Sequence, residues 1–194
     1  MIRTTERIKK LEDVLYKRQP DITVVIENVH DPHNVSAILR SCDASGVYEV
    51  QLLYTKEKFP IIDKKSSASA SKWIKRRLFK SIDECYGTLH REGFVIYATN
   101  LGQEAKDLYK IDLTKKVAIV FGNEHRGVSE EAAEKADALL KIQQVGLIQS
   151  LNVSVACAVV LFEVMRQRMV VGAFEKPKLS SSECSELLKE WIKK

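Results

Sequence analysis

The feature that most constrains the fold of this chain is an alternation of short apolar runs with amphipathic segments. Buried parallel strands read as continuous β-branched or apolar runs, and the helices that connect them carry apolar residues at helical spacing. Both patterns recur along the chain, so we expect an α/β fold in which helices flank a mostly parallel sheet. The predicted strands cover 22–26, 50–54, 94–97, 117–121 and 139–142. The first predicted helix begins near Val35, and three more cover 81–92, 129–136 and 151–169.

Further helices are predicted at both ends of the chain. Residues 5–18 have helical spacing, with Thr5 as a candidate cap and Gln19-Pro20-Asp21 as the break that follows. Residues 180–194 form a second such segment with a serine cap. We therefore expect a basic N-terminal helix over 1–20, an α/β domain over 21–170 and a C-terminal helical extension over 171–194.

Composition and charge narrow the class of protein. The chain carries 31 basic and 26 acidic residues, a net charge of +5, which favours anionic partners only weakly. The first ten residues are rich in charge, and the longest apolar run, 153–162, is shorter than the ~18 residues that a membrane span needs. We expect a cytoplasmic protein without a leader or a membrane span, whose four separated cysteines stay reduced.

Three polar clusters stand where a predicted strand gives way to a helix: 30–34, 122–127 and 149–154. Ligands of α/β sheets bind beyond the carboxyl ends of the strands, so these clusters predict a site. The alternative is local structure. Asn34 could be an N-cap, Ser150 or Asn152 could cap the last core helix, and Arg126 or Arg40 could pair with Glu124.

Several familiar motifs are missing from the sequence. Neither GxGxxG nor GxxxxGK[ST] occurs, which argues against a dinucleotide fingerprint and a P-loop. His30 and His33 have no nearby residues to complete a metal shell, so no metal is expected. Cys157 lies in an apolar helical run and is interpreted as a core residue.

The basic segment Lys72-Trp-Ile-Lys-Arg-Arg77 interleaves positive charges with an aromatic ring. Such a pattern suits nucleic acid, because charges meet phosphates while rings stack on bases. A solvated strand with a half-buried tryptophan would give the same pattern. Together with the basic N-terminal helix, the segment favours RNA, and the predicted RNA-binding residues are Arg3, Arg7, Lys10, Lys72, Lys75, Arg76 and Arg77.

The three polar clusters resemble the motifs of the SpoU family of AdoMet-dependent RNA ribose 2′-O-methyltransferases, of the SPOUT class. The first motif matches Asn28 to Arg40, the second Val120 to Ser129 and the third Ile142 to Ala156. The resemblance implies a deep trefoil knot over about residues 117–160, a homodimer with cofactor sites near the subunit interface, and S-adenosyl-L-methionine as the cofactor. One departure is Gln143-Gln144, where the family usually has Pro-Met.

The resemblance is strongest to the members that methylate the D-loop guanosine of tRNA, through Asp31 to Ala37 and Ser67 to Trp73. It implies methyl transfer to the ribose 2′-hydroxyl of that nucleotide. Two alternatives are the same chemistry on ribosomal RNA and a catalytically inactive RNA-binding module. The cofactor-binding positions that the resemblance implies are Thr99, Gly122, Ile142 and Leu151.

The family's key arginine corresponds to Arg40, with Asn34, Glu124, Ser150 and Asn152 as its active-site companions. In relatives, the corresponding arginine is assigned the role of activating the 2′-hydroxyl. A guanidinium stays protonated in proteins, so a less costly role is to grip the adjacent phosphate and align the 2′-oxygen. On this hypothesis Glu124 and Asn152 orient Arg40, while Ser150 and Asn34 contact the substrate.

Overall fold

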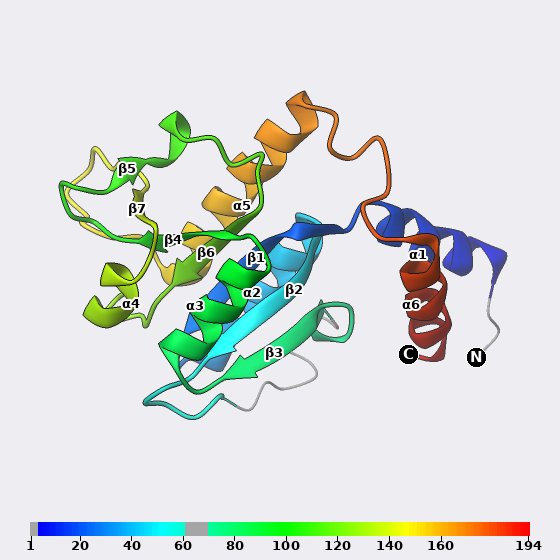
Figure 1. The fold of residues 1–194 in the computed structure, drawn as a ribbon, viewed down its shortest axis with the longest axis horizontal. Helices are drawn as coiled ribbons and strands as arrows, with labels where there is room; N and C mark the ends of the chain where they lie inside the picture. The colour runs from blue at the N-terminus through cyan, green and yellow to red at the C-terminus, as the bar shows by residue number, and fades with distance from the viewer. Residues whose placement is uncertain (1–3, 61–69) are drawn as a thin grey trace.

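The computed structural model describes residues 4–60 and 70–194, and its centre is a parallel sheet with helices on both faces (Figure 1). The strand order is β3-β2-β1-β6-β4-β7-β5, and each neighbouring pair is parallel. The predicted α/β class is confirmed. The strands are β1 (Gln19–Glu27), β2 (Val47–Leu53), β3 (Lys75–Phe79), β4 (Val95–Thr99), β5 (Lys106–Asp107), β6 (Val117–Phe121) and β7 (Ala138–Lys141).

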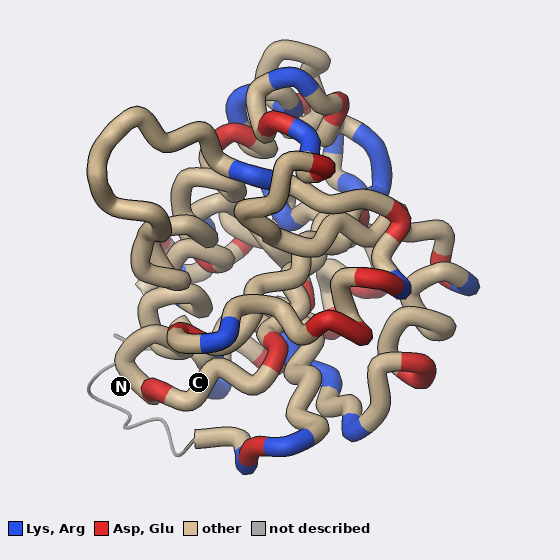
Figure 2. The backbone as a smooth tube through the Cα atoms, turned by 90° about the vertical axis from the view of Figure 1, so that its left-hand side faces the viewer, with Lys and Arg blue, Asp and Glu red and all other residues tan. Residues whose placement is uncertain are grey.

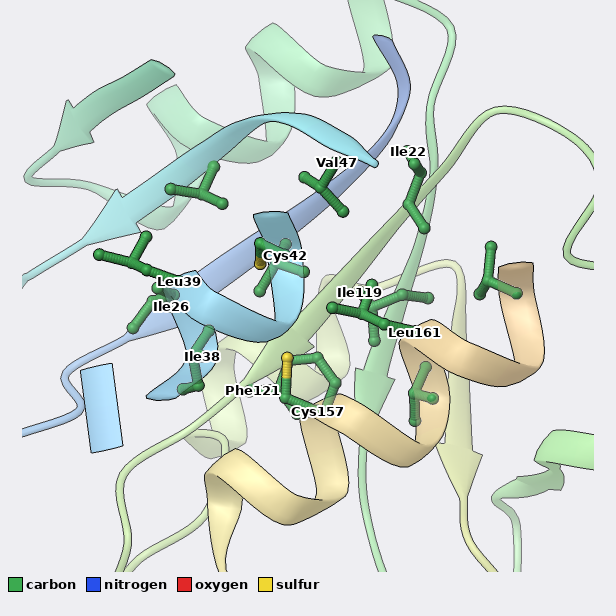
Figure 3. Close-up of a cluster of buried hydrophobic side chains, with 14 of the residues drawn as sticks. Ile22, Ile26, Ile38, Leu39, Cys42, Val47, Ile119, Phe121, Cys157 and Leu161 are labelled. Carbon is green, nitrogen blue, oxygen red and sulfur yellow. The ribbon is translucent and has the colours of Figure 1, made fainter. Parts of the chain in front are cut away.

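The two faces of the sheet bury different helices. Helices α2 (Pro32–Ala44) and α5 (Val153–Val170) cover one face, and α3 (Ile82–Arg91) and α4 (Glu130–Glu134) cover the other. Figure 3 shows Ile38 and Cys42 of α2 meeting Cys157 of α5 above the strands. Cys157 is therefore a core residue, as its apolar surroundings in the sequence predict.

One predicted boundary and two candidate caps are wrong. Gln19-Pro20-Asp21 does not precede the first strand but begins it, because the register shifts between Gln19 and Thr23 and the proline needs no ladder hydrogen bond there. The N-cap of α1 (Thr5–Tyr16) is Thr4 and not Thr5. The N-cap of α2 is Asp31, whose carboxylate accepts from the His33 N–H at 2.8 Å, so the Asn34 side chain is not needed to cap the helix.

The terminal helices α1 and α6 (Ser181–Lys193) lie side by side at one end of the molecule (Figure 1). Leu11, Leu15 and Trp191 form a small core between them. The Trp191 ring also stands 5.2 Å from the Trp73 ring and 5.4 Å from the buried Arg18 guanidinium. These contacts fasten both helices to the core, and α6 has the predicted serine cap at Ser180.

The described residues contain no helix of the length and apolarity that a bilayer crossing requires. The predicted knot over about 117–160 spans β6, α4, β7 and the first turns of α5. The knot and the three-segment division of the chain stay predictions. Residues 67–69 of the Ser67 to Trp73 stretch lie outside the described residues, which resume at Ala70 in the short 3-10 helix η1 (Ala70–Lys72).

Candidate active site

A cavity of about 490 Å³ opens at the carboxyl ends of β4, β6 and β7, beside the first turn of α5. This is the edge of the sheet where the polar clusters were expected to meet. The loops after these strands supply its walls. Seven of the predicted residues line it: Thr99, Gly122, Glu124, Ile142, Ser150, Leu151 and Asn152.

Glu124 stands at the rim of this cavity and is held by three hydrogen-bond donors. Its carboxylate accepts from the Asp31 N–H at 3.0 Å, the His30 N–H at 3.1 Å and the Asn34 amide at 3.0 Å. Partial burial raises the pKa of Glu124, but these hydrogen bonds outweigh burial, so the pKa lies below its ordinary value. Glu124 is therefore an anion at neutral pH, and its role is to accept hydrogen bonds.

The alternative in which Glu124 pairs with an arginine is wrong. Arg126 instead donates to Glu57 at 2.9 Å. Arg40 forms no ion pair or hydrogen bond with any part of the chain that the structure describes. Neutral donors at the start of α2 satisfy the carboxylate, because that helix begins close to the loop after β6.

Asn34 joins two of the polar clusters through its side chain. Its amide nitrogen donates to Glu124, and its amide oxygen accepts from the Asn152 amide at 3.0 Å. Asn152 also caps α5, since its oxygen accepts from the Ser154 N–H at 2.9 Å. The capping interpretation of Asn152 is therefore confirmed, and its active-site role stays a prediction; Ser150 lines the cavity and does not cap the helix.

Arg40 lies on the exposed side of α2, opposite the buried stripe of Val35, Ile38 and Cys42, as its spacing predicts. It is six residues beyond Asn34, or about 9 Å along the helix axis. It is not among the cavity's lining residues. Glu124 and Asn152 bind Asn34 and have no contact with Arg40 among the described residues, so their expected role in orienting Arg40 stays a prediction that would operate through the helix that Asn34 and Arg40 share.

The loop after β6 is shaped by close backbone contacts. A Cβ atom at Gly122 would stand 2.1 Å from the backbone of Gly127, so this position accepts only glycine. Asn123 accepts from the His125 N–H at 3.0 Å and donates to the Asn28 carbonyl at 2.9 Å. Sequence reasoning missed Asn123 and Asn28 as organising residues. Their position inside polar motifs was a usable signal, and Asn28 has a φ of 49°, which asparagine tolerates.

The predicted RNA-binding residues differ in exposure and in the acidic side chains that contact them. Arg77 is tied to Glu49 at 2.5 Å and to Glu92 at 2.5 Å, and Lys75 contacts Glu49 at 3.1 Å. Lys72 and Arg76 are exposed and take part in no side-chain ion pair within the described ranges. Lys10 is exposed on α1, where Arg7 is half-buried, and Arg3 lies outside the described residues.

Charge alone does not single out an RNA surface. Figure 2 shows basic and acidic residues mixed over the face that it presents. Within 4–60 and 70–194, no group of three or more His, Cys, Asp or Glu side chains gathers as a metal site would require, and the expected absence of a metal stays a prediction.

Comparison with known proteins identifies the family. The model of the SpoU rRNA Methylase family matches residues 21–162. A tRNA (guanosine(18)-2'-O)-methyltransferase of Thermus thermophilus is 45% identical over 192 residues, covering 99% of this chain and 98% of the relative. The crystal structure of the Aquifex aeolicus TrmH/SpoU tRNA modifying enzyme matches with a TM-score of 0.91 and 38% identity over 97% of this chain and 95% of that one.

A further solved structure carries the cofactor. It is the AdoMet-bound rRNA methyltransferase from Sinorhizobium meliloti, which is 28% identical, has a TM-score of 0.65 and matches 80% of this chain and 59% of its own. The order of the three polar motifs, the sheet and the full-length relatives agree, and the chain belongs to the SpoU methylase family.

Proposed function

We propose that this protein transfers a methyl group from AdoMet to the ribose 2′-hydroxyl of guanosine 18 in the D-loop of tRNA. The observation that carries the proposal is the linked set of Glu124, Asn34 and Asn152 at the rim of the strand-end cavity. Relatives with the same named activity match nearly the whole chain, at 45% identity in T. thermophilus and 38% in Escherichia coli. The rRNA enzymes of the family match at lower identity, 35% over 82% of this chain.

The cavity fits the cofactor. Its volume of about 490 Å³ suits a nucleoside-sized ligand, and strand-end backbone next to apolar side chains is the lining that such ligands need. The backbone at Thr99, Gly122, Ile142 and Leu151 would hold AdoMet, with Leu140 and Ala156 as apolar walls. When bound, AdoMet supplies a methyl group made electrophilic by its sulfonium.

The chain's own residues would align the nucleophile. Arg40 offers a solvated guanidinium without a partner among residues 4–60 and 70–194, which can bind the phosphate beside the target ribose with two hydrogen bonds and stabilise charge that develops on the 2′-oxygen. The proton would leave to that phosphate or to water, because a guanidinium is a costly base. Ser150 and Asn34 would contact the substrate, and Glu124 would hold Asn34 and the start of α2 in place.

We further propose a homodimer. Large apolar side chains stand exposed along one stripe of α5, with Val155 at 47%, Phe162 at 47% and Met169 at 58%. Val145, Leu147 and Ile148, in the loop beside the cavity, are more exposed still. A second copy that covered both regions would remove them from water and enclose the cofactor site. Sedimentation of Phe162→Glu tests this proposal: the variant should be monomeric, while Leu78→Glu, which changes an equally exposed residue on β3, should not.

The proposed activity is cytoplasmic and is tested by mapping the methyl group. Purified protein, labelled AdoMet and tRNA should give one 2′-O-methylguanosine, located in the D-loop. A matched tRNA with 2′-deoxyguanosine at that position has no acceptor hydroxyl and should remain unlabelled. Methylation of ribosomal RNA fragments in place of tRNA would refute the substrate assignment, and absence of transfer to either RNA would refute the activity.

A further inference from the structure

A second, larger cavity lies at the opposite edge of the sheet, and neither methyl transfer nor cofactor binding uses it. Its volume is about 700 Å³. It opens between α6 and the start of β2 and β3, in the part of the molecule where the terminal helices dock. Its walls combine the aromatic residues Tyr48, Trp73 and Trp191 with the basic residues Lys72, Arg76 and Lys194.

The aromatic part of this cavity is held rigid by the fold. Trp191 is 3% exposed and packs among Leu11, Leu15 and Arg18, so it can serve as a fixed support. Trp73 stands against it with an interplanar angle of 64° and stays partly exposed. A half-exposed indole that cannot turn away is a suitable surface for a planar ligand.

The basic groups differ in how far their neighbours engage them. Lys194 is tied down, since its ammonium contacts Glu190 at 2.7 Å and the Lys72 carbonyl at 2.6 Å. Lys75 is engaged by Glu49 and lies 5.8 Å from the Tyr48 ring. Lys72 and Arg76 have no such partner among the described residues, although both are exposed beside Trp73. Two unpaired cations beside an aromatic ring are complementary to an anionic, planar ligand.

We propose that this cavity binds an unpaired nucleotide of the tRNA, whose base packs against Trp73 while its phosphates meet Lys72 and Arg76. This inference rests on the proposed RNA substrate. The nucleotide is distinct from the methylated one, because four strand spacings separate β3 from β4, about 19 Å across the sheet alone. The cavity thus provides a second contact on the same RNA, with α6 as one of its walls.

Tryptophan fluorescence gives a direct readout, because Trp73 and Trp191 are the only two tryptophans in the chain. Titration with a short single-stranded RNA, without AdoMet, should quench the emission and protect it from acrylamide. A fully paired duplex of the same composition should do so much less, because its bases are not free to stack. Equal responses to both RNAs, or no response to either, would overturn the nucleotide pocket.

Charge variants test the phosphate contacts. Lys72→Ala combined with Arg76→Ala should raise the Kd for the single strand about tenfold, and the two lost contacts should flatten its salt dependence by about 0.7 each. Lys115→Ala, an exposed lysine outside the cavity, is the matched control and should change neither quantity. If the double variant behaved like the control, the proposal would be wrong.

The stacking contact needs a conservative pair of variants, because Trp73 also packs on Trp191. Trp73→Phe keeps a ring and Trp73→Leu does not, and circular dichroism verifies that both are folded. We expect Trp73→Phe to bind the single strand nearly as wild type and Trp73→Leu to lose at least fivefold, the lower limit for one stacked base. Equal affinities of two folded variants would refute stacking.

Methyl transfer separates this inference from the proposed function. In the charge variant, KM for tRNA should rise about tenfold while kcat stays unchanged, because the cavity is remote from the reacting atoms. Active variants with an unchanged KM would refute the second contact and leave the methyltransferase assignment intact. If the wild-type protein transferred no methyl group but RNA still quenched its fluorescence and the charge variant still bound RNA more weakly, the proposed function would be refuted and the nucleotide-binding cavity supported.

Discussion

Replacing Asn34 by aspartate tests the central contact of the active site with almost no change of shape. The substitution exchanges the amide group that donates to Glu124 at 3.0 Å for a carboxylate oxygen. The oxygen that accepts from Asn152 is kept. Two carboxylates would then face each other in place of a donor and an acceptor.

The cost can be worked from this geometry. A hydrogen bond to a charged group contributes about 1.5–3 kcal/mol, and it is lost. Two like charges at 3 Å repel by about 5.5 kcal/mol at an effective dielectric constant of about 20, and we halve this value because solvent reaches the cavity rim. The free energy of unfolding should therefore fall by about 4–6 kcal/mol at neutral pH or above, unless the pair takes up a proton.

Proton uptake determines whether the free energy of unfolding of the variant rises or falls with pH. In the wild type the pKa of Glu124 is lowered, so its stabilisation is present above the ordinary glutamate pKa and is lost as pH falls through the lowered value. In Asn34→Asp the pKa of one carboxyl must rise, so its stabilisation is present at low pH and is lost as pH rises through the raised value. The variant should therefore recover about 1.4 kcal/mol per pH unit on acidification through this window, where the wild type recovers nothing.

The assay is urea unfolding followed by circular dichroism between about pH 5 and pH 8, at one protein concentration because the proposed dimer would make stability depend on concentration. Asn34→Ala is the matched control, since it removes both hydrogen bonds without adding a charge. It should lose stability by an amount that hardly changes with pH. If Asn34→Asp showed the same pH dependence as Asn34→Ala, the two side chains would not face each other in solution and the site would be built differently.

Other parts of the molecule give further predictions. Arg40→Ala should abolish methyl transfer and leave AdoMet affinity unchanged by calorimetry, and Arg40→Lys should fail too because lysine lacks the two-pronged donor; near-normal turnover of either variant would remove Arg40 from the mechanism. Gly122→Ala should lose AdoMet binding, because its Cβ would stand 2.1 Å from the Gly127 backbone, whereas Gly146→Ala, which has open space, should bind normally; calorimetric binding by Gly122→Ala would refute the closed loop. Arg168→Met should lower the free energy of unfolding by about 3 kcal/mol, because this buried guanidinium binds Asp21 at 2.5 Å and three backbone carbonyls. Lys178→Met, which removes the other partner of Asp21, is the control. A smaller loss of stability in Arg168→Met than in Lys178→Met would contradict the structural role of Arg168.

The elements that the sequence predicts well are those with a buried face along their whole length. β6 is buried at every position, and α2 carries four apolar residues on one stripe, so each pattern fits only one type of secondary structure. β3 was considered only as an alternative because its first three residues are basic, which is how an edge strand is protected from pairing with other chains. β5 has two residues, too few for any periodicity.

The candidate site residues could be named from motifs, but their hydrogen-bond partners could not. Glu124 and Asn34 are 90 positions apart in the chain, and an arginine is the better partner for a carboxylate if only residue types are weighed. The fold decides otherwise, because the start of α2 brings two backbone N–H groups and one amide to the carboxylate. Asp31 and Asn34 are also equally good caps by type, and only the backbone at Asp31 determines which one begins the helix.

The contacts of Asn34 explain how a residue outside the cavity can govern alignment inside it. The cavity is built from β4, β6, β7 and α5, whereas Arg40 is carried by α2. Asn34 joins α2 to the loop after β6 through Glu124 and to the start of α5 through Asn152. The six residues from Asn34 to Arg40 rise about 9 Å along one continuous helix, so these two hydrogen bonds fix where the backbone of Arg40 stands relative to the cavity. An error of about 1 Å in such an alignment can cost a hundredfold in rate. The polar set joins α2 to the walls of the cavity, and under the proposed function it would fix the distance between the element that holds the methyl donor and the element that holds the acceptor.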